Sequence, residues 1–208
     1  MPVEFSSIES LVQDFREGKA IVLIDEETRE NEGDIIVSAE KITAEMVNFM
    51  AKYGRGLICL AITPDRADIL DLPFLPSRNQ KKNNTAFTLS IEAKEGITTG
   101  ISAADRAKTI LDAVDPQKGA DDIATPGHIF PVVAKKNGVL ERRGHTEAGV
   151  DFAKLAGLIP AAVICEIMND DGTMARLSSL LLFAKTHNLK IGRITDLIEF
   201  VENKKYRV

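Results

Sequence analysis

The chain has 208 residues, of which 44% are hydrophobic and 27% charged, and its net charge is −5. This composition is typical of a soluble globular protein and excludes fibrous and intrinsically disordered classes. The acidic excess argues against a dedicated nucleic-acid binder, which usually carries a basic surface. No secretory signal is visible, and no apolar run approaches the roughly 20 residues that span a bilayer. We therefore expect a soluble, cytoplasmic protein with a single domain over residues 1–208.

Helical and strand-like hydrophobic patterns alternate along the chain. Helices are predicted over residues 10–18, 43–52, a short stretch after Pro64, a stretch capped by Ser102, and residues 146–156, 175–187 and 195–202. Strands are predicted over residues 20–25, 34–39, 56–62, 85–93, 129–134, 161–168 and 190–192. Residues 71–84 contain two prolines and no period, which predicts a loop. The mixed order of elements favours a layered sheet covered by helices.

Residues 25–34, the acidic loop, hold six carboxylates and a single cation, Arg29. In an extended segment, the side chains of Glu30, Glu32 and Asp34 would project to the same side. Such a row of oxygens suits Mg²⁺, which usually binds one or two carboxylates together with water and substrate oxygens. The alternative is a solvated acidic turn, so the metal site needs partners from elsewhere in the chain.

A basic turn precedes the predicted helix 146–156. It contains Arg142, Arg143, Gly144 and His145, and Thr146 could cap the helix. Free backbone N–H groups and the helix dipole attract phosphate there, and arginine adds forked hydrogen bonds. His145 could supply an imidazole ligand to a metal beside that phosphate. The alternative is a helix cap with exposed arginines. Since the sequence has neither a P-loop nor a dinucleotide-binding fingerprint, the phosphate would belong to another kind of ligand.

Two further polar residues interrupt apolar surroundings. His128 follows a turn signal, Thr125-Pro126-Gly127, and leads into a predicted strand. Glu166 interrupts an apolar run, where a carboxylate is costly unless it is paired or used. The alternatives are a structural histidine and a strand-end glutamate that faces water. Cys59 and Cys165 both lie in apolar runs, so we expect reduced, buried thiols.

Five segments together resemble the 3,4-dihydroxy-2-butanone 4-phosphate synthase family of riboflavin biosynthesis, over about residues 21–200. They are DEETRENEGD at 25–34, TTGISAADR at 98–106, PGHIFP at 126–131, GHTEA at 144–148 and NDDGTMAR at 169–176. Each segment alone is a weak signal, but five in order are highly specific. The resemblance is to the monofunctional form, because two cysteines cannot supply the three-cysteine zinc site of the GTP cyclohydrolase II domain fused to some relatives.

The resemblance implies a lyase that converts D-ribulose 5-phosphate to 3,4-dihydroxy-2-butanone 4-phosphate and formate. It implies Mg²⁺ or Mn²⁺ as cofactor, with two ions per site, and a homodimer with sites near the subunit interface that binds neither nucleic acid nor membrane. It also implies an α+β fold of three α–β–α layers around a mixed twisted sheet, of the YrdC/RibB-like type.

The resemblance also implies roles for individual residues. Glu30 and His145 would be the metal ligands, and His128 and Glu166 the catalytic pair. The substrate contacts would be Arg29, Glu30, Asp34, Arg142, Arg143, Gly144, His145, Thr146 and Glu166. Asp25, Glu32 and Cys59 are further candidates for the same pocket.

Two other functions compete with this interpretation. A metal-dependent sugar-phosphate isomerase or aldolase would keep all the carbons of its substrate. A binding module, such as the RNA-modification proteins that have a related fold, would present a basic groove and would tolerate the loss of Glu30.

Overall fold

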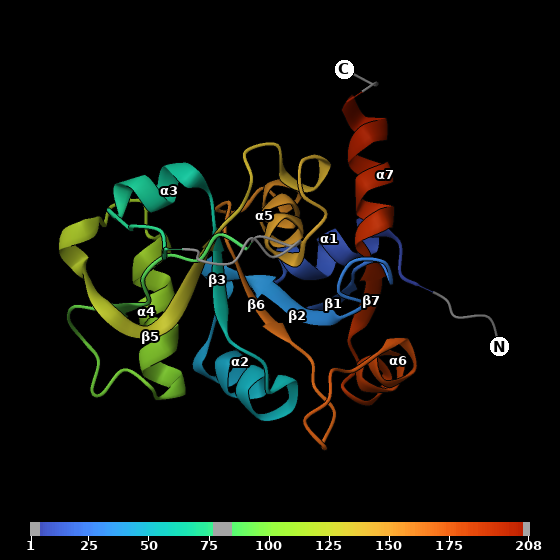
Figure 1. The fold of residues 1–208 in the computed structure, drawn as a ribbon, viewed down its shortest axis with the longest axis horizontal. Coiled ribbons are helices and arrows are strands. Elements are labelled where there is room, and N and C mark those ends of the chain that lie inside the picture. The colour runs from blue at the N-terminus through green and yellow to red at the C-terminus, as the bar shows by residue number, and fades with distance from the viewer. Residues whose placement is uncertain (1–4, 77–84, 206–208) are drawn as a thin grey trace.

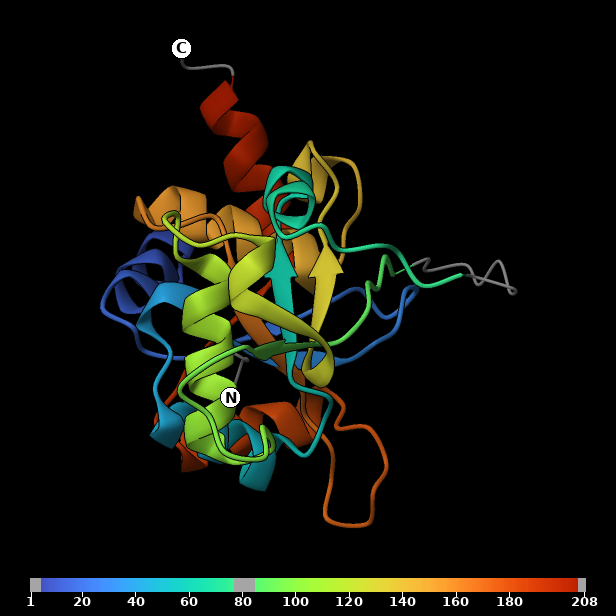
Figure 2. The ribbon, with the colours of Figure 1, turned by 90° about the vertical axis from the view of Figure 1, so that its left-hand side faces the viewer.

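The computed structural model describes residues 5–76 and 85–205. These residues form a mixed seven-stranded sheet with the strand order β4-β5-β3-β6-β2-β1-β7. The strands are β1 (Ile21–Ile24), β2 (Gly33–Ser38), β3 (Cys59–Ile62), β4 (Ile91–Ala93), β5 (Ile123–Val133), β6 (Ala162–Glu166) and β7 (Lys190–Arg193). Only two neighbouring pairs are parallel, β1 with β7 and β3 with β5, and the second pair runs side by side in Figure 2.

Helices cover both faces of the sheet. One layer holds α1 (Ile8–Arg16), α5 (His145–Ala156) and α7 (Ile194–Lys205). The other holds α2 (Ala44–Phe49), α3 (Pro64–Ile69), α4 (Ala103–Val114) and α6 (Leu177–Thr186). Figure 1 shows α1 and α5 on one side of the sheet and α2 and α6 on the other. The predicted α+β fold with three α–β–α layers is confirmed. No helix in the described ranges is long and apolar enough to cross a membrane.

The central strands show why the sheet needs a helical layer on each face. All four residues of β1 are buried, and successive side chains of a strand point to opposite faces. Ile21 and Leu23 accordingly pack into the core under α1 and α5, whereas Val22 and Ile24 pack into the core under α2 and α6. A strand that is apolar at every position is stable only when both faces are covered.

Two of the differences from the predicted elements concern a strand and the start of a helix. The strand predicted over 85–93 is reduced to β4, because residues 87–89 instead bond to residues 73–75 on one side and to β5 on the other. The helix predicted to be capped by Thr146 begins one residue earlier, at His145, with Gly144 at the cap position. The loop predicted over 71–84 lies partly outside the described residues.

The turn predicted at residues 125–127 is a bulge within β5. Ile91 pairs with Ile129, but the next residue, Glu92, pairs with Ala124. The intervening residues 125–128 therefore protrude from the ladder, with a cis peptide bond between Thr125 and Pro126. The bulge places His128 opposite β4, at the edge of the sheet.

The C-terminal end of α4 is held by Arg66. Its guanidinium donates to the carbonyl oxygens of Ala113 at 2.6 Å, Asp115 at 2.9 Å and Lys118 at 3.0 Å. A planar fork with several fixed donors can satisfy three carbonyl groups at once, which a lysine ammonium cannot do in the same geometry.

We expect Arg66→Lys to lower the free energy of unfolding by about 1–2 kcal/mol, because part-buried carbonyl groups lose their donors. The matched control is Arg143→Lys, whose single exposed ion pair with Glu26 should change stability by less than about 0.5 kcal/mol. Urea unfolding with a constant slope measures both effects. Equal losses in the two variants would contradict a special role for Arg66.

Candidate active site

The acidic loop is wound around the carboxylate of Asp25. Its Oδ1 accepts from the backbone N–H of Glu32 at 2.8 Å. Its Oδ2 accepts from the N–H of Glu30 at 3.0 Å and from the guanidinium of Arg29 at 2.8 Å. Asn31 adopts a left-handed conformation with φ of 55°. The extended row of carboxylates predicted from Glu30 onward is therefore wrong, because a buried side chain bonds the loop into a turn.

Arg176, just before α6, fixes the same loop from outside. Its guanidinium donates to the carbonyl oxygen of Glu30 at 2.8 Å and also to that of Asn31. The segment between β6 and α6 projects from the body of the protein in Figure 2. The spacing of residues in this segment predicts no function for it, and its only signal in the sequence is the family motif at 169–176.

His145 is the first residue of α5 and is buried. Its Nε2 lies 3.2 Å from the carbonyl oxygen of Leu23. Because a carbonyl only accepts, Nε2 carries the proton and Nδ1 keeps its lone pair. That Nδ1 faces Oδ1 of Asp34 at 3.6 Å. Burial lowers the pKa of His145 to about 4, so the imidazole is neutral near pH 7 and is in the form that binds metals.

Asp34, on β2, is a buried carboxylate of the loop with an unsatisfied oxygen. Its Oδ1 is buried and accepts no hydrogen bond in the described part of the chain. Burial raises the pKa of Asp34 well above its ordinary value, and the nearby charges of Glu166, Glu32 and Glu30 raise it further. This uncompensated negative charge beside a neutral imidazole fits a divalent cation.

The protein ligands available to such a cation are few. Within residues 5–76 and 85–205, no group of three or more His, Cys, Asp or Glu side chains is arranged to hold a metal ion. The predicted pair of ligands, Glu30 and His145, is compatible with that limit. Mg²⁺ commonly takes one or two carboxylates and completes its octahedron with water and substrate oxygens.

Two arginines meet at the N-terminus of α5. A Cβ atom added to Gly144 would lie 2.3 Å from Nη1 of Arg142 and 3.0 Å from Nη2 of Arg29. Arg142 is held in place by Glu147 at 2.6 Å and by the hydroxyl of Thr85 at 3.0 Å. Two guanidinium groups beside a helix N-terminus could hold an anion, and phosphate binding at this turn stays a prediction.

The neighbouring Arg143 and Thr146 contribute differently. The side chain of Arg143 is exposed and pairs with Glu26 at 2.9 Å, so only its backbone belongs to the turn under the two guanidinium groups. Thr146 is buried within the first turn of α5.

Glu166 is the last residue of β6 and lies opposite Asp34 in the register of the neighbouring strand β2. Its Oε2 accepts from the backbone N–H of Leu57 at 2.8 Å. It lines a cavity of about 290 Å³ together with Glu32, Arg55, Gly56, Leu57, Met168 and Met174. The alternative of a strand-end residue is correct for its position, but the side chain is hydrogen-bonded and faces a cavity.

Both cysteines are free and buried, as predicted. Burial raises the pKa of the Cys59 and Cys165 thiols, and the negative charges of Asp34 and Glu166 raise it further. A thiol held in its protonated form is a poor nucleophile. Cys59 packs in the core under α1 and α5, and its place in the substrate pocket stays a prediction.

His128 lies in the bulge of β5, and its ring Nδ1 is 3.0 Å from the carboxylate of Glu92. Strand β3 separates β5 from β6 in the sheet. Both His128 and Glu166 lie in the described part of the chain, where they share no hydrogen bond or ion pair. The fold thus presents the predicted catalytic pair on two different strands.

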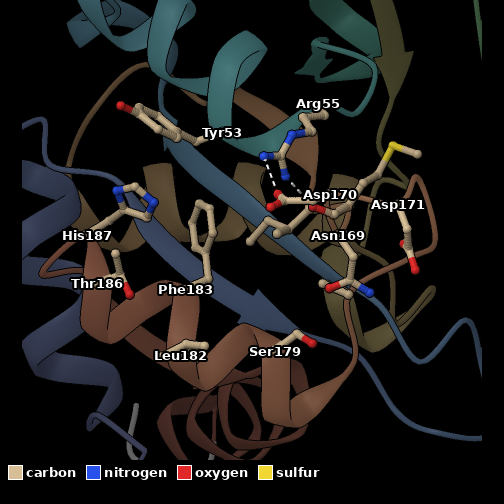
Figure 3. A pocket seen from close by; sticks show the side chains of 13 residues that line it. Tyr53, Arg55, Asn169, Asp170, Asp171, Ser179, Leu182, Phe183, Thr186 and His187 are labelled. Carbon is tan, nitrogen blue, oxygen red and sulfur yellow. Dashed lines mark hydrogen bonds and ion pairs between the residues drawn. The ribbon is translucent and has the colours of Figure 1, made fainter.

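A larger hollow of about 580 Å³ adjoins this cavity, and Arg55 and Met168 line both. Figure 3 shows Tyr53, Phe183 and His187 on one side of it and the Arg55–Asp170 ion pair, 2.6 Å long, on the other. It contains none of the predicted site residues. Of the predicted site residues, Glu166 and the further candidate Glu32 line the smaller cavity.

We expect Asp34→Asn to stabilise the metal-free protein near neutral pH by about 1–3 kcal/mol, because it removes a buried charge that has no donor. Since the folded-state pKa of Asp34 is raised, the wild type loses stability as pH rises above the unfolded-state value. The gain should therefore shrink as pH falls to about 4, the ordinary pKa of aspartate.

Thermal unfolding in EDTA at several pH values measures this effect. The control is Asp121→Asn at an exposed position, which should leave the midpoint nearly unchanged. An Asp34→Asn variant that is less stable than the wild type at neutral pH would contradict the interpretation.

Comparison with known proteins shows the family of the chain. The sequence profile of the 3,4-dihydroxy-2-butanone 4-phosphate synthase family matches residues 9–200. A 3,4-dihydroxy-2-butanone 4-phosphate synthase of Neisseria meningitidis serogroup A is 56% identical over 94% of the chain and 54% of its own length. A riboflavin biosynthesis protein RibBA of Aquifex aeolicus is 55% identical over 95% of the chain and 49% of its own length. The chain thus spans about half the length of these relatives.

A solved structure has the same fold over its whole length. It is a 3,4-dihydroxy-2-butanone 4-phosphate synthase in complex with two magnesium ions, with a TM-score of 0.93 and 39% identity. The alignment covers 98% of this chain and 100% of that one. The chain belongs to the 3,4-dihydroxy-2-butanone 4-phosphate synthase family.

Proposed function

We propose that the chain is a metal-dependent carbon–carbon lyase of riboflavin biosynthesis. It converts D-ribulose 5-phosphate to 3,4-dihydroxy-2-butanone 4-phosphate and formate. The observation that carries the proposal is that, in a member of this family, a cluster of arginines lies next to a buried histidine and an unsatisfied carboxylate. The guanidinium groups of Arg29 and Arg142 approach Gly144 at the N-terminus of α5. The next residue, His145, faces a buried carboxylate oxygen of Asp34 that accepts no hydrogen bond among the described residues.

The anion half of the site would hold the phosphate. Arg29 and Arg142 supply forked donors, and the backbone of residues 143–146 supplies the helix N-terminus. Binding energy from the phosphate, which does not react, positions the carbons that do. Asp34 and Glu166, paired on neighbouring strands, would contact the substrate hydroxyl groups.

The cation half would be held by Glu30 and His145. A bound Mg²⁺ or Mn²⁺ would supply Lewis-acid polarisation of the ketone and the adjacent hydroxyl groups. Two ions per site are supported by the solved relative in complex with two magnesium ions. The Nε2–H bond to Leu23 fixes the ring of His145, so that its Nδ1 lone pair stays directed at the site.

Proton transfer would fall to His128 and Glu166. The reaction removes a proton beside a ketone, loses a hydroxyl group, shifts the carbon skeleton and expels one carbon. An imidazole and a carboxylate can serve such steps as general acid and base. The hydrogen bond from Leu57 fixes the carboxylate of Glu166 at the cavity wall.

We also propose a cytoplasmic homodimer with sites near the subunit interface. Three large apolar side chains, Phe74, Leu75 and Leu89, are exposed on two segments that hydrogen-bond to each other. A second copy that covered them would remove apolar surface from water. The net charge of −5 gives no support to nucleic acid as a partner.

We expect purified protein, ribulose 5-phosphate and Mg²⁺ to yield formate and the four-carbon phosphate in equal amounts. EDTA should abolish the reaction and added Mg²⁺ should restore it, because few protein groups can replace the cation's charge. Formate assay and ¹³C NMR of the products measure this. Interconversion of pentose phosphates without formate would instead identify an isomerase.

We expect Glu30→Gln and His145→Ala to reduce turnover far more than the roughly 10–100-fold typical of losing an outer-shell partner of a metal ligand. Both variants should keep the circular dichroism spectrum of the wild type. The matched control is Glu27→Gln, an exposed acid of the same loop, which should keep full activity. Full Mg²⁺-dependent turnover in Glu30→Gln would refute the assignment of the ligand.

A further inference from the structure

Glu92 is a buried acid that the proposed chemistry does not use. It lies on β4 with 8% of its surface exposed, opposite the bulge of β5. Its Oε2 accepts from the backbone N–H of His128 at 2.8 Å. The ring Nδ1 of His128 lies 3.0 Å from Oε2 and 3.1 Å from Oε1. One carboxylate thus binds both the backbone and the side chain of this histidine.

This geometry fixes the proton on the ring. An ionised carboxylate can only accept, so Nδ1 carries the hydrogen and Nε2 is left with its lone pair. The side chain of His128 is 44% exposed, which leaves the ring accessible for exchange of a proton. A carboxylate on the Nδ1–H of a histidine is the arrangement that holds acid–base imidazoles in one tautomer and orientation.

Two glycines lie in close contact with the same carboxylate, where a side chain would not fit. A Cβ atom on Gly100, where φ is +90°, would lie 1.1 Å from Oε1 of Glu92 and 2.7 Å from Nδ1 of His128. A Cβ atom on Gly127 would lie 2.4 Å from Oε2 of Glu92. These glycines belong to the motifs at 98–106 and 126–131, so two distant segments meet at Glu92.

The first of these segments is itself held in place. The carboxylate of Asp105, in the first turn of α4, accepts from the N–H of Thr98 at 3.1 Å, its hydroxyl at 2.7 Å and the N–H of Gly100 at 3.0 Å. The motif at 98–106 therefore builds the wall that confines Glu92 against the ring of His128.

We propose that Glu92 is the positioning residue of His128, holding its ring in the Nδ1–H tautomer so that Nε2 exchanges protons with the substrate. The inference rests on the proposed acid–base role of His128. A purely structural Glu92 would stabilise the bulge through the backbone N–H of His128 alone, and the two roles can be separated by experiment.

The decisive variant is Glu92→Gln. It keeps the size of the side chain but replaces one acceptor oxygen with an NH₂ donor, where the structure requires two acceptors. The ¹⁵N shifts of the His128 ring, assigned by comparison with His128→Asn, report the tautomer. We expect Nδ1–H in the wild type and in Glu92→Asp, and loss of that single tautomer in Glu92→Gln.

Kinetics give the second readout. We expect kcat of Glu92→Gln to fall by about 10²–10⁴-fold, the usual contribution of a positioned acid or base, with KM little changed. Glu92→Asp should recover part of this loss, because it keeps both acceptors. In a His128→Asn background, Glu92→Gln should cause no further loss. The control Glu95→Gln, at an exposed position just after β4, should match the wild type.

Each contrary outcome is distinct. Wild-type kcat and an unchanged tautomer in Glu92→Gln, with His128→Asn inactive, would overturn the role of Glu92 and leave that of His128 intact. An equal loss of kcat in the presence and absence of His128, with the tautomer unchanged, would make Glu92 structural and overturn the inference. An active His128→Asn would refute the proposed acid–base residue itself, and the inference with it.

Discussion

Repulsion among carboxylates at one end of β1 and β2 is the constraint on which the site depends. Asp25 and Asp34 are both buried there, but they differ in the hydrogen bonds that their carboxylates accept. Asp25 accepts from two backbone N–H groups and one guanidinium, which compensate its charge. Asp34 is left with a buried oxygen that has no donor among the described residues. The first carboxylate builds the loop, and the second gives it a buried charge that a proton or a ligand must neutralise.

Arg29 connects the acidic and basic halves of the site. It bonds to Asp25 at 2.8 Å and to Glu30 at 2.5 Å, while its other Nη lies above Gly144 beside Arg142. Under the proposed function, an anion above Gly144 would draw on the same guanidinium that pairs with Glu30. A cation bound by Glu30 would replace that pairing. Phosphate and metal would therefore favour each other's binding through the side chain of Arg29.

The sequence predicts the parts of this fold that depend on hydrophobic pattern alone. The apolar run of β1 has one stable environment, between two helical layers, and the structure has it there. Side-chain hydrogen bonds to the backbone caused the wrong prediction for the acidic loop. Nothing in the order of residues 25–34 reveals that Asp25 will bind the N–H groups of Glu30 and Glu32 and bend an acidic run that alternation would extend.

In the candidate site, acids within apolar runs could be predicted from the sequence, but their partners could not. Glu166 stood out as an acid in an apolar run, and the same reasoning applied to Glu92, between Ile91 and Ala93, would have singled it out as well. Its partner was not visible, because the pairing depends on a bulge that brings His128 across from β4. Arg176 was hidden for a similar reason, since its acceptors are backbone carbonyl groups 145 and 146 residues away.

His145 and His128 are bonded to different acceptors, and this difference suits the two rings to different chemistry. His145 donates from Nε2 to the carbonyl of Leu23, which leaves Nδ1 unprotonated, with its lone pair in a buried place. His128 is bonded at Nδ1 by the carboxylate of Glu92, which leaves Nε2 on a half-exposed ring. A neutral acceptor and burial suit a metal ligand, which must not take up a proton. A charged acceptor and access to solvent suit a group that must gain and lose one. Under the proposed function, the acceptor bonded to each ring, more than the histidine itself, would therefore decide which chemistry the ring performs.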